Sequence, residues 1–350
     1  MASPLTRCGN TFRSGLVDHL TDIAKLTSNQ DRQADLRAWT RRVDFLAAQP
    51  GIGDIRVEVA ASDVASVSRG RIRWNGSNMN AYGAAFDHAH QRHINIVLIA
   101  MPPWRSADMS DVQYRSMLSS YYDEIGSFSA VHHIVDIDIN ELGAHNAVTG
   151  QPITNITPRY LNAAVSLVLV ASHAVRRHVP KAQIIVSESA AMTPEATMKL
   201  LAVFAALKDA GVTFIRGLNI YAGGPVEVAE IAPLIDTVRR DGDVWVTEFG
   251  VPSVGANGEA TQALRVEQIF EAIIKAGVKR VIGYEEMDEP RLQHLTNLSP
   301  AEKNYGIIWR ADGSMKPAAG VFLSIARRGS GDGCATSGRN DRARTTASRS

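Results

Sequence analysis

One rhythm runs through the sequence between about residue 13 and residue 326. A stretch of ten to twenty residues with helical periodicity precedes a short run of apolar and β-branched residues, and a polar segment with Gly or Pro follows. Apolar runs that alternate with amphipathic helices are typical of βα units and a parallel sheet. Seven such runs are clear, and a weaker eighth precedes them: residues 54–59, 94–101, 133–139, 182–187, 213–220, 243–247 and 280–284, after 13–20.

The helical stretches carry ordinary start and stop signals. Thr193 and Pro194 stand at a helix start, and Gly211 and Gly277 each lie between a helix and the next strand, where a left-handed residue ends a helix. Eight βα units in one chain favour a closed barrel. An open sheet would carry a glycine-rich phosphate loop after its first strand, and the sequence has none. We therefore predict an α/β protein with a single (β/α)8 TIM barrel over residues 13–326.

The two ends of the chain differ from this repeat. Residues 1–12 are predicted to be a short extension without the apolar core of a signal peptide. Residues 327–350 are rich in Gly, Ser, Thr and Arg and hold almost no large apolar side chain, so we predict a disordered tail. As written, the chain is expected to be cytoplasmic. An exported protein whose true start lies upstream fits the sequence equally well.

Charge and composition narrow the classes of partner. The 37 Lys and Arg nearly balance the 36 Asp and Glu, so no overall field favours nucleic acid or an anionic membrane. No run of 18 apolar residues occurs. Cys8 and Cys334 lie outside any metal or redox spacing, and His88, His90 and His93 are interpreted as part of a surface helix because they share no single helical face. We expect a monomer with a neutral substrate and no metal or cofactor.

The residues that end the predicted strands are unusually polar. Reactive groups of a (β/α)8 barrel stand at the carboxyl ends of its strands and in the loops that follow. These positions hold Asn140 and Glu141 in the fourth strand, Asn219 and Tyr221 in the sixth, Thr247 and Glu248 in the seventh, and Tyr284, Glu285 and Glu286 in the eighth; Arg56 lies within the second run and Trp104 follows the third.

Glu141 and Glu248 are the pair on which a chemical hypothesis rests. Cleavage of a glycosidic bond needs two carboxyl groups across the sugar, about 5–5.5 Å apart in retaining enzymes. Strands four and seven are separated by two strands around the ring, so their ends would form different walls of one cleft. A strand-end lysine, which an aldolase would need for a Schiff base, is absent from the predicted strands.

These motifs also resemble a known family. Asn140-Glu141 and the Thr-Glu-Phe-Gly around Glu248 are similar to the strand-four and strand-seven motifs of glycoside hydrolase clan A, which includes cellulases, mannanases, β-xylosidases and exopolysaccharide endoglycosidases. The resemblance covers most of residues 13–326, including Arg56 and Tyr221. It implies a carbohydrate substrate and hydrolysis with retention of configuration.

The resemblance also implies a role for each residue. Glu248 would be the nucleophile, Glu141 the general acid/base, and Asn140 a hydrogen-bond partner of the sugar 2-hydroxyl. Arg56 and the Tyr221 hydroxyl would keep the nucleophile charged, whereas the acid/base needs a raised pKa, which a less polar pocket provides.

The sequence departs from the family pattern at two places. Leu142 stands where members usually have proline, and Tyr284-Glu285 stands where most have a tryptophan that floors the sugar site. Tyr284 or Trp104 could supply the stacking surface instead. The missing tryptophan keeps a second hypothesis open, namely a catalytically weak barrel that binds glycan or a protein partner.

Other acids remain candidates for sugar binding or catalysis. Asp138 alternates with apolar residues along strand four and is expected inside the barrel, where a buried acid needs a partner. The sequence does not identify that partner. The other acids at predicted strand ends are Glu188, Glu285, Glu286 and Asp288.

Overall fold

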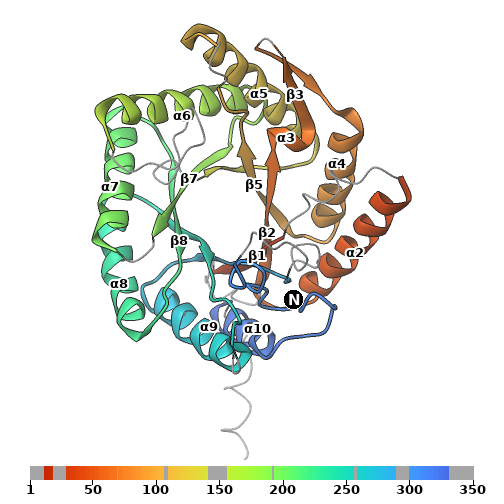
Figure 1. Cartoon of the computed structure of the whole chain (residues 1–350), viewed down its shortest axis with the longest axis vertical. Helices are drawn as coiled ribbons and strands as arrows, with labels where there is room; N and C mark the ends of the chain where they lie inside the picture. The colour runs from red at the N-terminus through yellow and green to blue at the C-terminus, as the bar shows by residue number, and fades with distance from the viewer. Residues whose placement is uncertain are drawn as a thin grey trace, which may run out of the picture.

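A closed, all-parallel barrel of eight strands forms the centre of the molecule, with strand order β1-β10-β9-β8-β7-β6-β5-β2 (Figure 1). The computed structural model describes residues 12–18, 29–68, 70–105, 109–140, 156–190, 193–255, 258–288 and 299–330. Strand β1 closes the ring by pairing with both β2 and β10. The barrel strands are β1 Arg13–Val17, β2 Ile52–Ala60, β5 Asn95–Met101, β6 Asp136–Asn140, β7 Gln183–Ala190, β8 Ile215–Ile220, β9 Val244–Phe249 and β10 Arg280–Gly283.

Helices surround the barrel; along the sequence they connect consecutive barrel strands, except that the last helix follows β10 (Figure 1). They bury their apolar faces against the outer face of the sheet in one continuous core. In the described ranges no helix is long and apolar enough to cross a membrane. The helices are α2 Asn29–Ala47, α4 Gly76–Gln91, α5 Asp111–Val131, α6 Pro158–His178, α7 Pro194–Asp209, α8 Pro225–Arg239, α9 Gly258–Lys275 and α10 Pro317–Gly329.

The predicted fold class is confirmed, because each of the eight predicted runs is a barrel strand. The helix signals also behave as expected. The Thr193 side chain accepts a hydrogen bond from the Ala196 backbone amide and caps α7. Gly211 and Gly277 have φ of +73° and +76° in the turns after α7 and α9.

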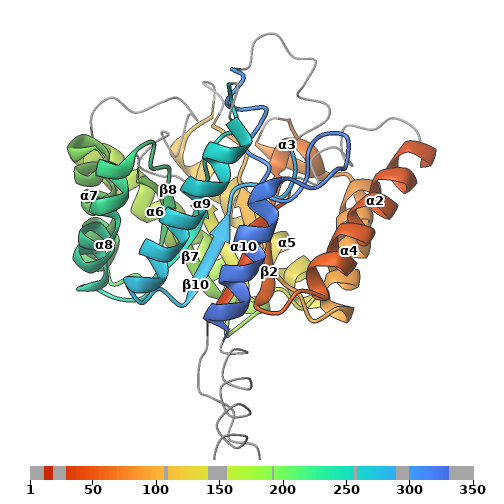
Figure 2. The ribbon, with the colours of Figure 1, turned by 90° about the horizontal axis from the view of Figure 1, so that it is seen from below.

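The carboxyl ends of the strands face upward in Figure 2, on the same side as the short helix α3 (Ala61–Val64). This helix and the hairpin of β3 (Ala65–Ser68) and β4 (Arg71–Trp74) belong to the connection that follows β2. Most of the predicted extension and tail, residues 1–11 and 331–350, lies outside the described residues. We use the word mouth for the end of the barrel where the strands end.

Candidate active site

A buried arginine lies at the centre of the candidate site. Arg56 comes from β2 and has no exposed surface. Its Nε donates to Asp138 Oδ2 on β6 at 3.0 Å, and its Nη2 donates to Ser187 Oγ on β7 at 3.1 Å. Ser187 in turn donates to Asp138 Oδ1 at 2.8 Å. Arg56 is therefore the partner that the buried Asp138 needs.

Glu248 is the second carboxylate on this arginine. Arg56 Nη1 donates to Glu248 Oε1, and the Tyr221 hydroxyl donates to Glu248 Oε2. Each carboxylate oxygen thus has a different donor. Glu248 is 8% exposed whereas Arg56 and Asp138 are at 0%, so Glu248 is the most accessible of these three charged residues. The structure brings together four residues that the sequence singled out, Arg56, Asp138, Tyr221 and Glu248.

A register shift between β8 and β9 places Glu248 in this position. Leu218 pairs with Val246, but the next residue, Asn219, pairs with Glu248, so β9 has one extra residue here. The extra residue is Thr247, whose hydroxyl donates to Asn219 Oδ1 at 2.8 Å. A bulge of this kind redirects side chains at a strand end.

Burial and the Arg56 guanidinium act in opposite directions on the Asp138 carboxyl. Desolvation raises the pKa of the Asp138 carboxyl, and the Arg56 guanidinium opposes that shift. The two carboxylates Asp138 and Glu248 share one guanidinium, which bonds both of them. The cluster therefore has one formal positive charge against two negative charges when both carboxylates are ionised.

Three tyrosine rings pack against one another next to Glu248. Tyr221 and Tyr284 have ring centroids 5.9 Å apart, and Tyr305 lies 5.7 Å from Tyr221 and 5.4 Å from Tyr284, all edge to face. Burial raises the pKa of Tyr284, and the charges of Glu285 and Glu248 raise it further. Tyr284 thus occupies the position where the family resemblance implies tryptophan. Tyr305 was not among the site residues predicted from the sequence.

The remaining strand-end acids have other surroundings. Glu286 lies against Arg42 and Asp18, with Arg42 Nε 3.3 Å from Glu286 Oε2, and burial raises the pKa of Glu286. Asp288 accepts hydrogen bonds from Lys316 Nζ at 2.7 Å and from the Gly306 amide at 2.8 Å.

Glu188 and Glu285 are also buried, at 1% and 2% exposure. The charge of Glu188 acts on Tyr160 of α6, whose pKa burial raises, so Glu188 lies on the helix side of β7. Glu285 bonds to the segment of Tyr305 through its backbone, donating to Tyr305 O at 3.3 Å and accepting from the Ile307 amide at 2.7 Å. The role of Glu285 in sugar binding stays a prediction.

Two of the predicted site residues, Glu141 and Asn140, lie wholly or partly outside the described part of the chain. Glu141 lies in residues 141–155, outside the described residues. Asn140 is the last residue of β6 and pairs with Ser187 of β7, but its side chain is not described. Trp104 follows β5 and is 43% exposed, which leaves its ring accessible to a ligand.

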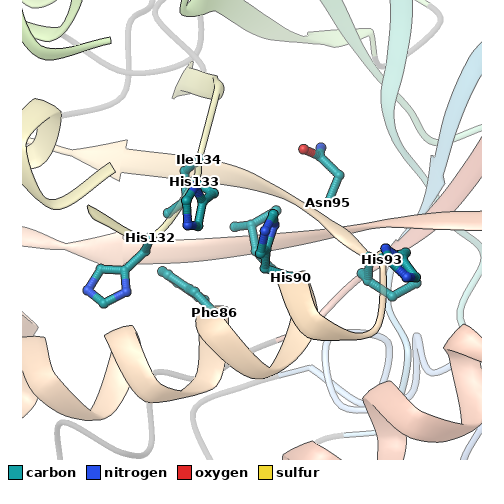
Figure 3. A pocket seen from close by; sticks show the side chains of 9 residues that line it. Phe86, His90, His93, Asn95, His132, His133 and Ile134 are labelled. Carbon is teal, nitrogen blue, oxygen red and sulfur yellow. The ribbon is translucent and has the colours of Figure 1, made fainter. Parts of the chain in front are cut away.

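The histidines in the last turn of α4 and in the turns after α4 and α5 lie at the end of the barrel opposite the mouth. His90 stacks on His133 with ring centroids 4.3 Å apart, and these two rings, with His93 and His132, line a pocket of about 270 Å³ (Figure 3). His88 instead bonds to Asp44 at 2.8 Å. Stacked imidazoles aim their lone pairs in parallel and not at one point. In the described part of the chain no three His, Cys, Asp or Glu side chains are arranged to hold a metal ion.

Comparison with known proteins identifies the fold. No protein-family model matches the chain, and no curated protein matches it in sequence. Among solved structures, the exo-β-1,4-mannosidase Op5Man5 from Opitutaceae bacterium strain TAV5 is similar, with a TM-score of 0.69 and 15% identity over 92% of this chain. The match covers 60% of the mannosidase chain.

Two xylanases match over nearly their whole length. A GH10 endoxylanase retrieved from a sugarcane soil metagenome gives a TM-score of 0.65 and 15% identity, and xylanase XynB from Paenibacillus barcinonensis gives 0.64 and 17%. Each comparison covers 90% of this chain and 96% of the xylanase. The chain therefore has the barrel fold of these β-glycosidases, as the sequence resemblance implied.

Proposed function

We propose that this protein is a glycosidase, a retaining glycoside hydrolase that cleaves β-linked oligo- or polysaccharide by double displacement. The environment of Glu248 carries the proposal, because its two carboxylate oxygens are held by two different donors, Arg56 and Tyr221. A carboxylate nucleophile must be charged and must keep one orientation toward the anomeric carbon. The guanidinium favours the charge, and the phenol fixes the second oxygen.

The proposed reaction has two steps. Glu248 bonds to the anomeric carbon while Glu141 protonates the departing oxygen, and Glu141 then takes a proton from the water that cleaves the glycosyl-enzyme bond. Two inversions give retention. Arg56 does not react, and Asp138 balances its charge inside the barrel.

Sugar binding is assigned to residues around this pair. Asn140, at the end of β6, is proposed to bond the sugar 2-hydroxyl, and Glu285 another hydroxyl. Tyr284 and the accessible Trp104 offer aromatic surfaces for the sugar rings. The barrel neighbours support a glycan substrate, because their names describe a mannosidase and xylanases.

The decisive experiment separates the two carboxyl roles through leaving groups. Glu141→Ala should strongly slow hydrolysis of β-glycosides with poor leaving groups, which need a proton, but should spare the first step for 2,4-dinitrophenyl β-glycosides. Azide, which needs no general base, should restore turnover of the activated substrates and give the β-glycosyl azide. Aryl glucosides, mannosides, xylosides and galactosides are tested together because the structure does not identify the sugar.

Glu302→Ala is the matched control, since Glu302 is an exposed acid whose charge reaches Tyr284. It should behave as the wild type with every leaving group. An azide product of inverted configuration, or equal damage for good and poor leaving groups without rescue, would remove Glu141 from the acid/base role. Glycan binding by a wild-type protein that hydrolyses none of the substrates would favour the weak, glycan-binding barrel.

A further inference from the structure

Tyr305 has a more constrained position than its place in a long connection suggests. Its ring contacts both Tyr221 and Tyr284 edge to face. It also reaches the end of β9, because a Cβ added at Gly250 would lie 3.1 Å from Tyr305 Cδ1. Gly250 follows Glu248 by two residues. Tyr305 thus touches the residue that bonds Glu248 and the strand that carries Glu248.

Buried polar side chains fix the backbone of Tyr305 and of the residue that follows it. Gln262 of α9 has no exposed surface, and its Nε2 donates to Val251 O at 2.9 Å and to Gly306 O at 3.0 Å. Asp288 accepts from the Gly306 amide, and Lys316 bonds that carboxylate. Buried amide and ion-pair networks of this kind hold a segment rigidly.

Gly306 allows this close approach. An added Cβ there would lie 2.2 Å from the Asp288 backbone nitrogen, which no real side chain tolerates. The segment can therefore press against the chain after β10 only because residue 306 is glycine. Three elements, β10, α9 and the segment before α10, combine to set the place of one ring.

The ring of Tyr305, and not its hydroxyl, makes these contacts. Within the described residues the Tyr305 hydroxyl has no hydrogen-bond partner, whereas the Tyr221 hydroxyl donates to Glu248 Oε2. We propose that Tyr305 is a positioning residue that packs on Tyr221 and Tyr284 and so keeps the Tyr221 hydroxyl on Glu248. The catalytic consequence rests on the proposed function of Glu248.

The kinetic test is a double-mutant cycle with Tyr221. Tyr305→Ala should lower the rate of Glu248 labelling by a 2-deoxy-2-fluoro aryl β-glycoside, and kcat for the matching substrate, by about 10- to 100-fold, the effect of one hydrogen bond to a charged group. KM should change little. Tyr221→Phe should cost a similar factor, and the double variant should be no worse than Tyr221→Phe alone. Losses that multiply in the double variant overturn the proposal.

Two matched variants separate positioning from general packing. Tyr305→Phe keeps the ring and should retain wild-type rates. Phe214→Ala removes a ring whose centroid lies 5.7 Å from that of Phe204, in a contact between α7 and the residue just before β8, and should lower Tm without lowering kcat. A Tyr305→Phe variant as impaired as Tyr305→Ala contradicts a role for the ring.

A crystal structure of Tyr305→Ala gives a readout that does not depend on activity. The distance between the Tyr221 hydroxyl and Glu248 Oε2 should exceed hydrogen-bond range, about 3.5 Å. An unchanged hydrogen bond overturns the positioning role whatever the kinetics. If the wild type hydrolyses no glycoside, the proposed function fails, and this distance still decides the role of Tyr305.

Discussion

Two buried arginines, each bonded to two carboxylates, lie at different depths of the same barrel. Near the mouth, Arg56 bonds Asp138 and Glu248. Near the other end, Arg280 bonds Asp54 at 2.6 Å and Asp136 at 2.7 Å. The chemical groups are the same in both clusters, so their composition does not distinguish a reactive site from a structural one.

The surroundings of the carboxylates differ. In the Arg280 cluster the Asn95 amide bonds both aspartates, at 3.1 and 2.8 Å, and the guanidinium lies 3.9 Å from the centroid of the Trp245 ring. Asp54 and Asp136 are 0% and 2% exposed, whereas Glu248 is 8% exposed. In the lower cluster the most exposed charged residue is Arg280, at 9%, and both carboxylates are closed off. In the upper cluster it is Glu248, whose carboxylate a ligand at the mouth can reach. Access to a carboxylate, and not charge pairing, separates the two roles.

The largest expected effect is on activity, at Glu248. Glu248→Gln should reduce kcat on the order of 10⁴- to 10⁶-fold, because no glycosyl-enzyme can form, while Tm changes little. Asp54→Asn is the matched isosteric change in the lower cluster and should lower Tm while kcat per folded molecule stays at the wild-type value. Kinetics and thermal unfolding of both variants check this. A Glu248→Gln enzyme with wild-type turnover would remove Glu248 from the mechanism.

The next effect is on stability, at Arg280. Arg280→Met leaves buried Asp136 without a cation and buried Asp54 with only the exposed Arg13, 3.8 Å away, which should cost about 3–5 kcal/mol of unfolding free energy. Urea unfolding measures the loss, and activity well below Tm should persist. Adding Asp54→Asn and Asp136→Asn to Arg280→Met should recover much of the stability, since no uncompensated charge remains. A loss under about 1 kcal/mol would show that water reaches these carboxylates.

The sequence predicts the closed sheet well because strand runs and helix caps are local signals. It also finds Arg56, Tyr221 and Glu248, because barrel strands end at one mouth. It could not pair Asp138 with Arg56, which lies 82 residues away on a strand that is not its neighbour. Pairing across a barrel interior depends on the stagger of the strands, which no local pattern records.

Two other features could not be predicted from the sequence, for different physical reasons. Tyr305 lies in a connection without periodicity, and the contacts that fix it, from Gln262 and Asp288 to Gly306, join residues far apart in the sequence. Glu188 and Glu286 stand at strand ends as the catalytic acid would, yet they lie against Tyr160 and against Arg42 with Asp18. Because a single-residue shift reverses the facing of a strand residue, the sequence ranks such acids poorly.

A smaller effect, on pH dependence, is expected at Glu286. Burial and the neighbouring Asp18 raise the pKa of Glu286 well above its ordinary value, with Arg42 opposing the shift. The folded protein then keeps a proton that the unfolded chain releases near pH ~4.3. Stability from this group is present below that pH and is lost as pH rises toward the folded pKa.

Glu286→Gln cannot ionise, so it should flatten the decline of Tm with rising pH in that window. Thermal unfolding from pH 4 to pH 9 measures the slope for the wild type and the variant. Glu195→Gln is the control, because the Glu195 side chain is 70% exposed and should leave the slope unchanged. An identical slope in Glu286→Gln and wild type would mean that Glu286 is ionised in the folded state at the pH values tested.

The smallest expected effect concerns the turns at the end of the barrel opposite the mouth. Several turns from helix to strand have a left-handed residue, among them Gly211 and Gly277 with φ of +73° and +76°, and His93 and His133 with +60° and +58°. A residue with a side chain loses about 1–2 kcal/mol of stability in the left-handed conformation. Glycine avoids this strain but loses about 0.4–1 kcal/mol of stability, because it makes the unfolded chain more flexible. His133→Gly should therefore stabilise by roughly 0.5–1 kcal/mol, without changing kcat.

Gly211→Ala is the reciprocal change, because an added Cβ there meets no atom within 4 Å and reports backbone strain alone. It should destabilise the protein by a similar amount, again with no effect on kcat, since both turns lie at the end of the barrel opposite Glu248. Urea unfolding of the two variants at one pH gives both values. If His133→Gly is destabilising while Gly211→Ala behaves as expected, then the stack of His133 on His90, 4.3 Å between centroids, outweighs the strain. The end of the barrel opposite the mouth would then contain a stabilising histidine pair as well as the Arg280 cluster.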